Sequence, residues 1–264
     1  MQLYLALTPE EYPRFMNRSA AFVHMAYQCS PEGTLTRLPL TTGEQRGLLG
    51  LNSHGLAESA DAGTLFPQLL RECRQRHYTG VFADMESACT PQRLQFFTSL
   101  SQALQKQGLS LFLPEEYAAV PGCIPLLCTA ISGGCLQTYL QESLQRRGSE
   151  AAALDLQRLR MDFTLPAPSG TGHSLSPGEF QQLLAERAPS IFYSSELGAK
   201  YFTYTHSGQT HFVLFDDAQT LRNKLRLGRQ LGFSAAFLMY PECSDLLEDL
   251  LPAQQKNRPL HPQG

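Results

Sequence analysis

Apolar runs of strand length alternate with helix-length segments along nearly the whole chain. The strand-like runs are 3–7, 21–27, 48–52, 80–86, 109–113, 124–130, 154–165 and 235–240. The clearest helix-like segments between them are 64–76, 91–106, 135–147 and 218–231. Nearly continuous apolar strands that alternate with helices are typical of a parallel sheet covered by helices. Eight such strands predict an α/β protein with a (β/α)8 TIM-barrel fold.

The alternation breaks between the seventh and eighth strand-like runs. Segments 201–204 and 211–215 are rich in aromatic residues and flank a Ser-Gly dipeptide, which is the pattern of a short antiparallel hairpin. We therefore predict a single barrel domain over 1–251, with a small α+β insertion at about 169–217. The segment 252–264 is rich in Pro and Gln and is expected to form a disordered tail.

The fourth run, 80–86, is apolar until it ends in two carboxylates, Asp84 and Glu86. Side chains alternate between the faces of a strand, so Phe82, Asp84 and Glu86 are expected on one face. In a barrel this face would point into the opening at the carboxyl ends of the strands, where barrel enzymes carry out their chemistry. Burial and mutual repulsion would raise the pKa of one carboxyl, as a general acid requires. The alternative is that both acids lie beyond the strand end and are solvated.

Acids at two other element ends have simpler explanations. Asp217 precedes the segment 218–231 and is predicted to cap that helix, where a negative charge favours the helix dipole. Glu115 and Glu116 follow the fifth strand-like run, so they are expected near the barrel opening and solvated.

Composition narrows the class of protein. The chain has 264 residues, of which 42% are hydrophobic and 17% charged, as in a globular protein. A formal net charge of -3 without a basic cluster argues against nucleic acid and against a membrane surface as partners. The seven cysteines are scattered without a CxxC pair, so neither a metal site nor a disulfide framework is predicted. The N-terminus lacks the pattern of a signal peptide, so synthesis in the cytoplasm without a signal peptide is expected. The cysteines are expected to be reduced thiols in that setting.

Several segments, in order, resemble the family 18 glycoside hydrolases, the chitinase-like barrels. The segment 79–86 stands in register with the family motif Asp-Gly-x-Asp-x-Asp-x-Glu. Upstream, 25–27 and 30–35 are similar to the second strand and turn of the spore cortex-lytic N-acetylglucosaminidases. Downstream, 215–224 and 232–240 resemble that branch's insertion strand, last helix and eighth strand.

The resemblance implies a bacterial, spore-associated hydrolase of β-1,4-linked N-acetylglucosamine glycans, meaning peptidoglycan or chitin-like chains. In this family the motif glutamate protonates the glycosidic oxygen while the sugar's own acetamido group attacks the anomeric carbon, with retention of configuration. Glu86 matches that general acid, and Asp84 matches the aspartate that orients the acetamido group. The implied partner is a polysaccharide or oligosaccharide, and the implied chemistry uses no metal or cofactor.

The sequence also departs from the family pattern. Thr79 and Phe82 replace the first two motif aspartates, and 128–131 lacks the tyrosine and aspartate that end the family's sixth strand. Tyr240 stands where the resemblance places a tryptophan beneath the sugar. Because each lost transition-state hydrogen bond costs about 10²- to 10³-fold in rate, the alternative function is a catalytically inactive chitinase-like barrel that binds glycan or a spore protein.

Four residues are candidates for substrate binding. Phe82 faces inward on the fourth strand, and Tyr240 can stack against a sugar ring. Tyr27 ends the second strand-like run, where packing in the core is the alternative. His54 follows the third run, where a polar loop histidine is the alternative.

Overall fold

The structure is a computed structural model that describes residues 1–15, 20–30, 32–39, 47–52, 62–85, 88–148, 151–167 and 170–251. The expectations for Glu86, for His54 and for the tail 252–264 therefore lie outside the described residues.

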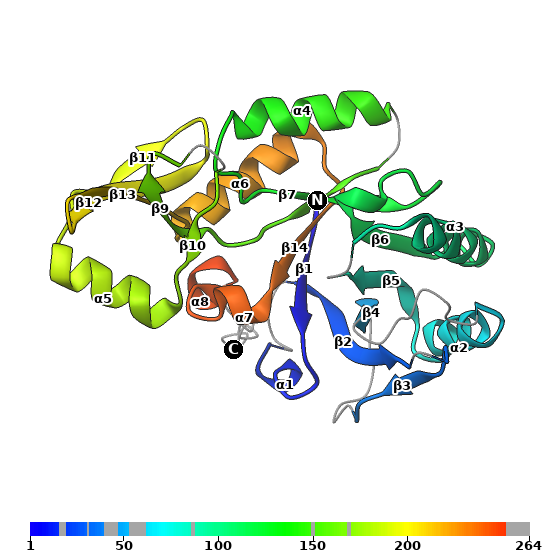
Figure 1. Ribbon diagram of the computed structural model, residues 1–264. Coiled ribbons are helices and arrows are strands. Elements are labelled where there is room, and N and C mark those ends of the chain that lie inside the picture. Colours follow the sequence, from blue (N-terminus) through cyan, green and yellow to red (C-terminus); the bar gives the residue numbers. More distant parts are fainter. Residues whose placement is uncertain are drawn as a thin grey trace, which may run out of the picture.

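Eight parallel strands form a closed barrel, which confirms the predicted fold (Figure 1). In chain order they are β1 (Gln2–Leu7), β2 (Ala21–Cys29), β4 (Gly47–Asn52), β5 (Tyr78–Asp84), β6 (Ser110–Pro114), β7 (Ile124–Cys128), β8 (Ala153–Asp155) and β14 (Ala235–Met239). Parallel pairing of β1 with both β2 and β14 closes the circle. A short strand, β3 (Leu35–Arg37), adds antiparallel to the end of β2.

Helices surround the barrel. They are α1 (Tyr12–Phe15), α2 (Ala62–Gln75), α3 (Pro91–Gln105), the 3-10 turn η1 (Glu115–Tyr117), α4 (Leu136–Arg147), α6 (Ala218–Leu231), α7 (Tyr240–Cys243) and α8 (Leu247–Leu250). On α6, Leu221 and Leu225 are four positions apart and buried, as an amphipathic helix requires. Asp217 caps this helix by accepting a hydrogen bond from Thr220 N at 2.9 Å, which confirms the predicted cap. Among the described residues, no helix is long and apolar enough to cross a membrane.

The barrel interior is filled by one buried side chain or more from every barrel strand. They are Ala6, Val23, Leu48, Phe82, Phe112, Leu126, Ala153, Ala235 and Phe237. Phe237 lies at the centre, with its ring 5.1 Å from that of Phe82 and 5.0 Å from that of Phe112. On β5, Val81 and Ala83 instead pack in the layer beneath α2 and α3, so the predicted alternation of faces is confirmed for the described part of this strand.

A second sheet lies beside the barrel, at the left of Figure 1. Its strands run antiparallel in the order β10 (His173–Ser174), β9 (Arg160–Leu165), β13 (Gln209–Phe215), β12 (Ala199–His206) and β11 (Phe192–Ser194). The helix α5 (Pro177–Arg187) packs on one face through Phe180, which contacts the ring of Phe215. The predicted hairpin is the pair β12 and β13, joined by Ser207 and Gly208, which both have positive φ.

The seventh barrel strand differs from the prediction. The run 154–165 was expected to hold the seventh barrel strand, but that strand, β8, ends at Asp155, and the rest of the run contributes β9 to the second sheet. In β9, polar and apolar residues alternate, which suits an antiparallel strand whose two faces differ and not a strand buried on both sides. The excursion between β8 and α6 therefore begins before residue 160. Its ends meet where Asp216 N donates to Leu159 O at 2.9 Å.

Candidate active site

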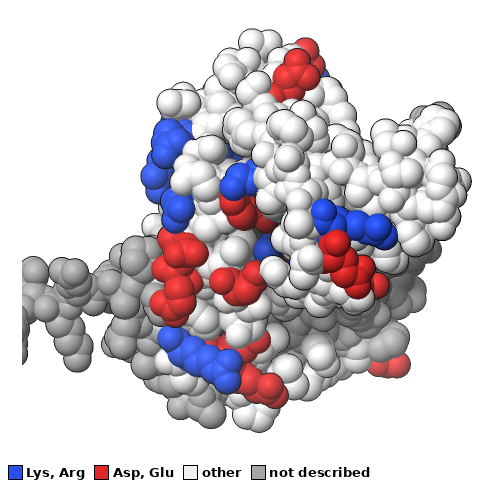
Figure 2. All heavy atoms as spheres, turned by 90° about the vertical axis from the view of Figure 1, so that its left-hand side faces the viewer, with Lys and Arg blue, Asp and Glu red and all other residues white. Residues whose placement is uncertain are grey.

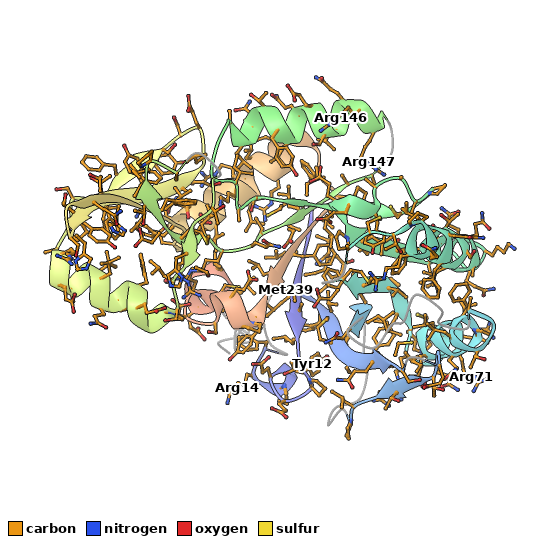
Figure 3. The ribbon with its side chains drawn as sticks, in the orientation of Figure 1. Tyr12, Arg14, Arg71, Arg146, Arg147 and Met239 are labelled. Atoms are coloured by element: carbon orange, nitrogen blue, oxygen red, sulfur yellow. The ribbon has the colours of Figure 1, made fainter. Side chains whose placement is uncertain are left out.

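A cavity of about 400 Å³ opens at the carboxyl ends of the barrel strands. We call this opening the mouth. The residues that line the cavity are Phe82, Ala83, Asp84, Met85, Pro114, Glu115, Glu116, Leu126, Cys128, Asp155, Gln157, Met239, Pro241 and Glu242. Met239 ends β14 and is labelled near the centre of Figure 3. The cavity thus collects side chains from β5, β6, β7, β8 and β14.

Five of the residues that line the cavity carry carboxyl groups. They are Asp84, Glu115, Glu116, Asp155 and Glu242. Asp84 is at the end of β5, as expected from the sequence, and is partly exposed to the cavity. Glu115 accepts a hydrogen bond from the hydroxyl of Tyr139 on α4, whereas Glu116 is exposed. A mouth with this many acids concentrates negative charge in a partly desolvated space, and such a space favours protonation of some of them.

Asp155 is the most strongly perturbed of these acids. Burial, and then the charges of Glu242 and Asp84, raise its pKa to about 7, although a hydrogen bond from Gln157 acts in the opposite direction. Burial also raises the pKa of Glu242, with a further contribution from the charge of Asp84. The mouth therefore holds one carboxyl, that of Asp155, whose pKa lies close to neutral pH, and a protonated carboxyl is what a general acid requires.

Glu242 is held by the segment that follows β8. Its Oε2 accepts a hydrogen bond from Arg158 N at 3.2 Å, and its main-chain oxygen accepts one from the Arg158 guanidinium at 3.2 Å. That guanidinium also forms an ion pair with Asp245. A second cavity, of about 320 Å³, shares Gln157 and Glu242 with the first and extends toward β9. The two cavities are therefore adjacent, and the second is bounded by the inserted sheet.

Phe82 and Tyr240 occupy different settings. Phe82 lines the floor of the cavity, above Phe237. Tyr240 begins α7 and packs its ring 5.4 Å from that of Phe15, so it is not among the residues that line the cavity. Phe237 and Met239 face inward on β14, and the next residue falls on the opposite face. The inward aromatic residue of the eighth strand is therefore Phe237, which is 1% exposed.

Tyr27 also lies away from the cavity, as the core-packing alternative had it. It is 1% exposed, and its hydroxyl donates a hydrogen bond to Glu72 Oε2 on α2 at 2.9 Å. The register of β2 shifts between His24 and Tyr27, and this irregularity places the consecutive residues Ala26 and Tyr27 in the same layer beneath the helices. A bulge of this kind leaves no clear mark in the sequence.

Sequence reasoning did not single out Asp155 or Glu242. Both follow apolar strands, which is the signal that identified Asp84 and Glu86. Asp155 was not recognised as a strand end because the apolar run continues past it to residue 165. Glu242 was not recognised because it follows a proline at the start of a short helix. Among the described residues, no group of three or more His, Cys, Asp or Glu side chains is arranged to hold a metal ion.

Comparison with known proteins extends the description of the fold. No family model matches the chain. The spore cortex-lytic enzyme SleL of Bacillus cereus superimposes with a TM-score of 0.64 at 15% identity, over 94% of this chain and 74% of that one. A chitinase from Chromobacterium violaceum gives 0.63 at 13% identity, over 91% and 94%. A family 18 chitinase from Cycas revoluta, in complex with allosamidin, gives 0.64 at 10% identity, over 95% and 97%.

These comparisons define the class of fold. The chain is a (β/α)8 barrel similar to those of the family 18 chitinases and spore cortex-lytic enzymes, and it is divergent in sequence. The resemblance expected from the motifs is thus confirmed at the level of the fold. At identities of 10% to 15%, this likeness establishes architecture, and activity has to be argued from the site.

Proposed function

We propose that this protein is a glycoside hydrolase that acts on β-1,4-linked N-acetylglucosamine glycans, either peptidoglycan or chitin-like chains. The observation that carries the proposal is the convergence of carboxyl groups, two with raised pKa values, in the mouth of a barrel of the chitinase type. A substrate-assisted glycosidase requires a protonated carboxyl that acts as general acid at the scissile bond. Uncharged residues cover most of the described part of the face shown in Figure 2, with acidic and basic side chains scattered among them.

The proposed mechanism uses the substrate's own acetamido group. Glu86, two positions after Asp84, donates its proton to the glycosidic oxygen as the bond to the anomeric carbon breaks. The acetamido carbonyl oxygen attacks that carbon from the opposite face, while Asp84 accepts a hydrogen bond from the acetamido N–H and stabilises the developing positive charge. Glu86 then removes a proton from water, which attacks the anomeric carbon and restores the acetamido group with retention of configuration.

The test is product analysis by mass spectrometry. The protein is incubated with chitooligosaccharides and with cortex peptidoglycan fragments, alongside the variants Glu86→Gln and Glu142→Gln. Because general acid catalysis contributes about 10²- to 10⁴-fold, we expect Glu86→Gln to lose cleavage by at least about 10²-fold. Glu142 is exposed on α4, away from the mouth, so Glu142→Gln should cleave at the rate of the unmodified protein. Cleavage that persists in Glu86→Gln would contradict the role of this residue.

A second candidate is a barrel that binds glycan without cleaving it. It is favoured by one observation: the inward residue at the end of β7 is Cys128, whose thiol donates to Gln157 Oε1 at 3.4 Å, where a hydroxyl or carboxyl group would assist catalysis. Burial raises the pKa of this thiol to about 11, so it stays neutral. Saturable binding of chitotetraose, with no product from either substrate class, would support this second function over the first.

A further inference from the structure

Asp155 points into the mouth from the end of β8. On this strand Ala153 packs inside the barrel and Leu154 packs outside it, so the next side chain returns to the inside. In register, Asp155 lies between Cys128 on β7 and Phe237 on β14, and it lines the cavity. Its carboxyl group therefore lies at the surface of the cavity that a ligand would enter.

One oxygen of this carboxyl is engaged and the other is available. Gln157 Nε2 donates to Asp155 Oδ2 at 2.9 Å, and Gln157 in turn accepts from the Cys128 thiol. Within the described part of the chain, Asp155 Oδ1 has no hydrogen-bond partner. The hydrogen bonds from Cys128 to Gln157 and from Gln157 to Asp155 therefore engage Oδ2 and leave Oδ1 for a ligand.

The mouth is poor in side-chain hydrogen-bond donors. Of the described residues that line the cavity, only Gln157 and Cys128 carry side-chain donors near neutral pH. The Cys128 thiol donates to Gln157, and one of the two Gln157 N–H groups donates to Asp155. The ionised carboxylates of the mouth can only accept. A sugar presents carbonyl, ether and hydroxyl oxygens, and its acetamido carbonyl can only accept. A ligand of this kind therefore needs a donor that the ionised acids cannot supply.

We propose that Asp155 binds substrate as a neutral carboxylic acid and donates a hydrogen bond from Oδ1 to an oxygen atom of the bound sugar. The inference rests on the proposed function, because it takes a glycan as the ligand. It assigns Asp155 a direct role in binding and makes affinity depend on pH.

The charged groups around Asp155 support this assignment. Burial, together with the charges of Glu242 on α7 and Asp84 on β5, brings the pKa of Asp155 to about 7. Glu115 and Glu116 on η1 line the far side of the cavity. Arg158 acts on Glu242 through its backbone N–H and Arg160 acts on Glu242 through its charge, whereas the pKa of Asp155 is shifted by burial, by the two acids and by the Gln157 hydrogen bond.

The test measures binding and not turnover. Isothermal titration with chitotetraose is carried out from pH 5.5 to pH 8.5 on the full chain carrying Glu86→Gln, so that the ligand is not consumed. This Glu86→Gln chain is called the parent. Three further variants are compared in its background: Asp155→Asn, Asp155→Ala and Asp249→Asn. Asp249 is exposed on α8 and serves as the matched control.

If Asp155 donates as a neutral acid, affinity should fall about tenfold between pH 6 and pH 8, following a single group with a pKa near 7. Asp155→Asn keeps an amide donor in place and should bind with an affinity that no longer varies with pH. At every pH, the affinity of Asp155→Ala for chitotetraose should be about tenfold lower than that of the parent at pH 6. Asp249→Asn should retain the pH dependence of the parent.

Two results would overturn the inference while leaving the proposed function standing. One is binding by the parent that does not vary with pH. The other is a pH dependence that persists in Asp155→Asn, which would assign the titration to another group. Absence of binding by the parent at any pH would overturn both proposals. Circular dichroism of each variant establishes that it is folded, and the near-isosteric Asp155→Asn keeps the test valid should Asp155→Ala not fold.

Discussion

At Asp155, folding moves a carboxyl pKa from an ordinary value of 3.8 to about 7. The folded state therefore binds this proton more tightly than the unfolded chain does. The resulting contribution to stability is complete below pH 4 and is lost as the pH rises through 7. Above that pH, the folded protein holds an ionised group that its surroundings disfavour.

Replacing Asp155 with asparagine removes this cost. We expect Asp155→Asn to raise the free energy of unfolding at pH 8 by about 2 to 4 kcal/mol relative to the unmodified protein, and to change it little at pH 4. Urea unfolding at the two pH values measures the difference. Asp249→Asn is the matched control, because its carboxyl is exposed and lies outside the cavity. Equal effects of Asp155→Asn at both pH values would mean that the folded pKa is not raised.

At the scale of elements, a buried ion pair connects α6 to the insertion. Lys224 Nζ lies 2.7 Å from Asp216 Oδ2, and the two side chains are 1% and 0% exposed. Asp216 also accepts hydrogen bonds from Thr220 Oγ1 at 2.7 Å and from Leu159 N at 3.1 Å. This carboxylate therefore joins the last strand of the insertion, the first turn of α6 and the chain that leaves β8.

Breaking this pair on one side leaves a buried charge without its partner. Lys224→Met should lower the free energy of unfolding by about 3 to 5 kcal/mol. The double variant Lys224→Met/Asp216→Asn should recover part of that loss, because the unpaired charge is gone. Chemical denaturation of the unmodified protein, of Lys224→Met, of Asp216→Asn and of the double variant measures the coupling energy. A double variant that is as unstable as the sum of the two single variants would show that the pair is not coupled.

Element patterns that are local in sequence could be predicted, and those that depend on neighbouring strands could not. The stripe of α6, the cap at Asp217 and the alternating faces of β5 follow from residue spacing alone. The bulge in β2 that turns Tyr27 outward depends on pairing with β4, and the end of β8 at Asp155 depends on where the second sheet starts. Only part of the site could therefore be predicted from the sequence, which identified Asp84 but not Asp155.

At the scale of the whole molecule, the insertion is a closed excursion from the barrel. Leu159 and Asp216 are joined by main-chain and side-chain hydrogen bonds, so the chain leaves and returns at one place. The insertion has a core of its own, in which α5 packs against β12 and β13. It touches the barrel elsewhere, for example where Leu136 N at the start of α4 donates to Glu196 O at 2.7 Å. An element of this kind can be removed with its ends rejoined.

Replacing residues 160–215 with a short glycine linker should therefore leave a folded barrel of lower stability. The second cavity, which extends from Glu242 toward Met161 and Phe163 of β9, would lose its wall, whereas the first cavity would keep its lining. We expect affinity for chitotetraose to fall by at least about tenfold and affinity for chitobiose to change by less than about threefold, since only the longer ligand reaches the second cavity. Circular dichroism and titration calorimetry measure the two effects. Equal losses for both ligands in a folded variant would show that the inserted sheet shapes the mouth itself and does not extend it.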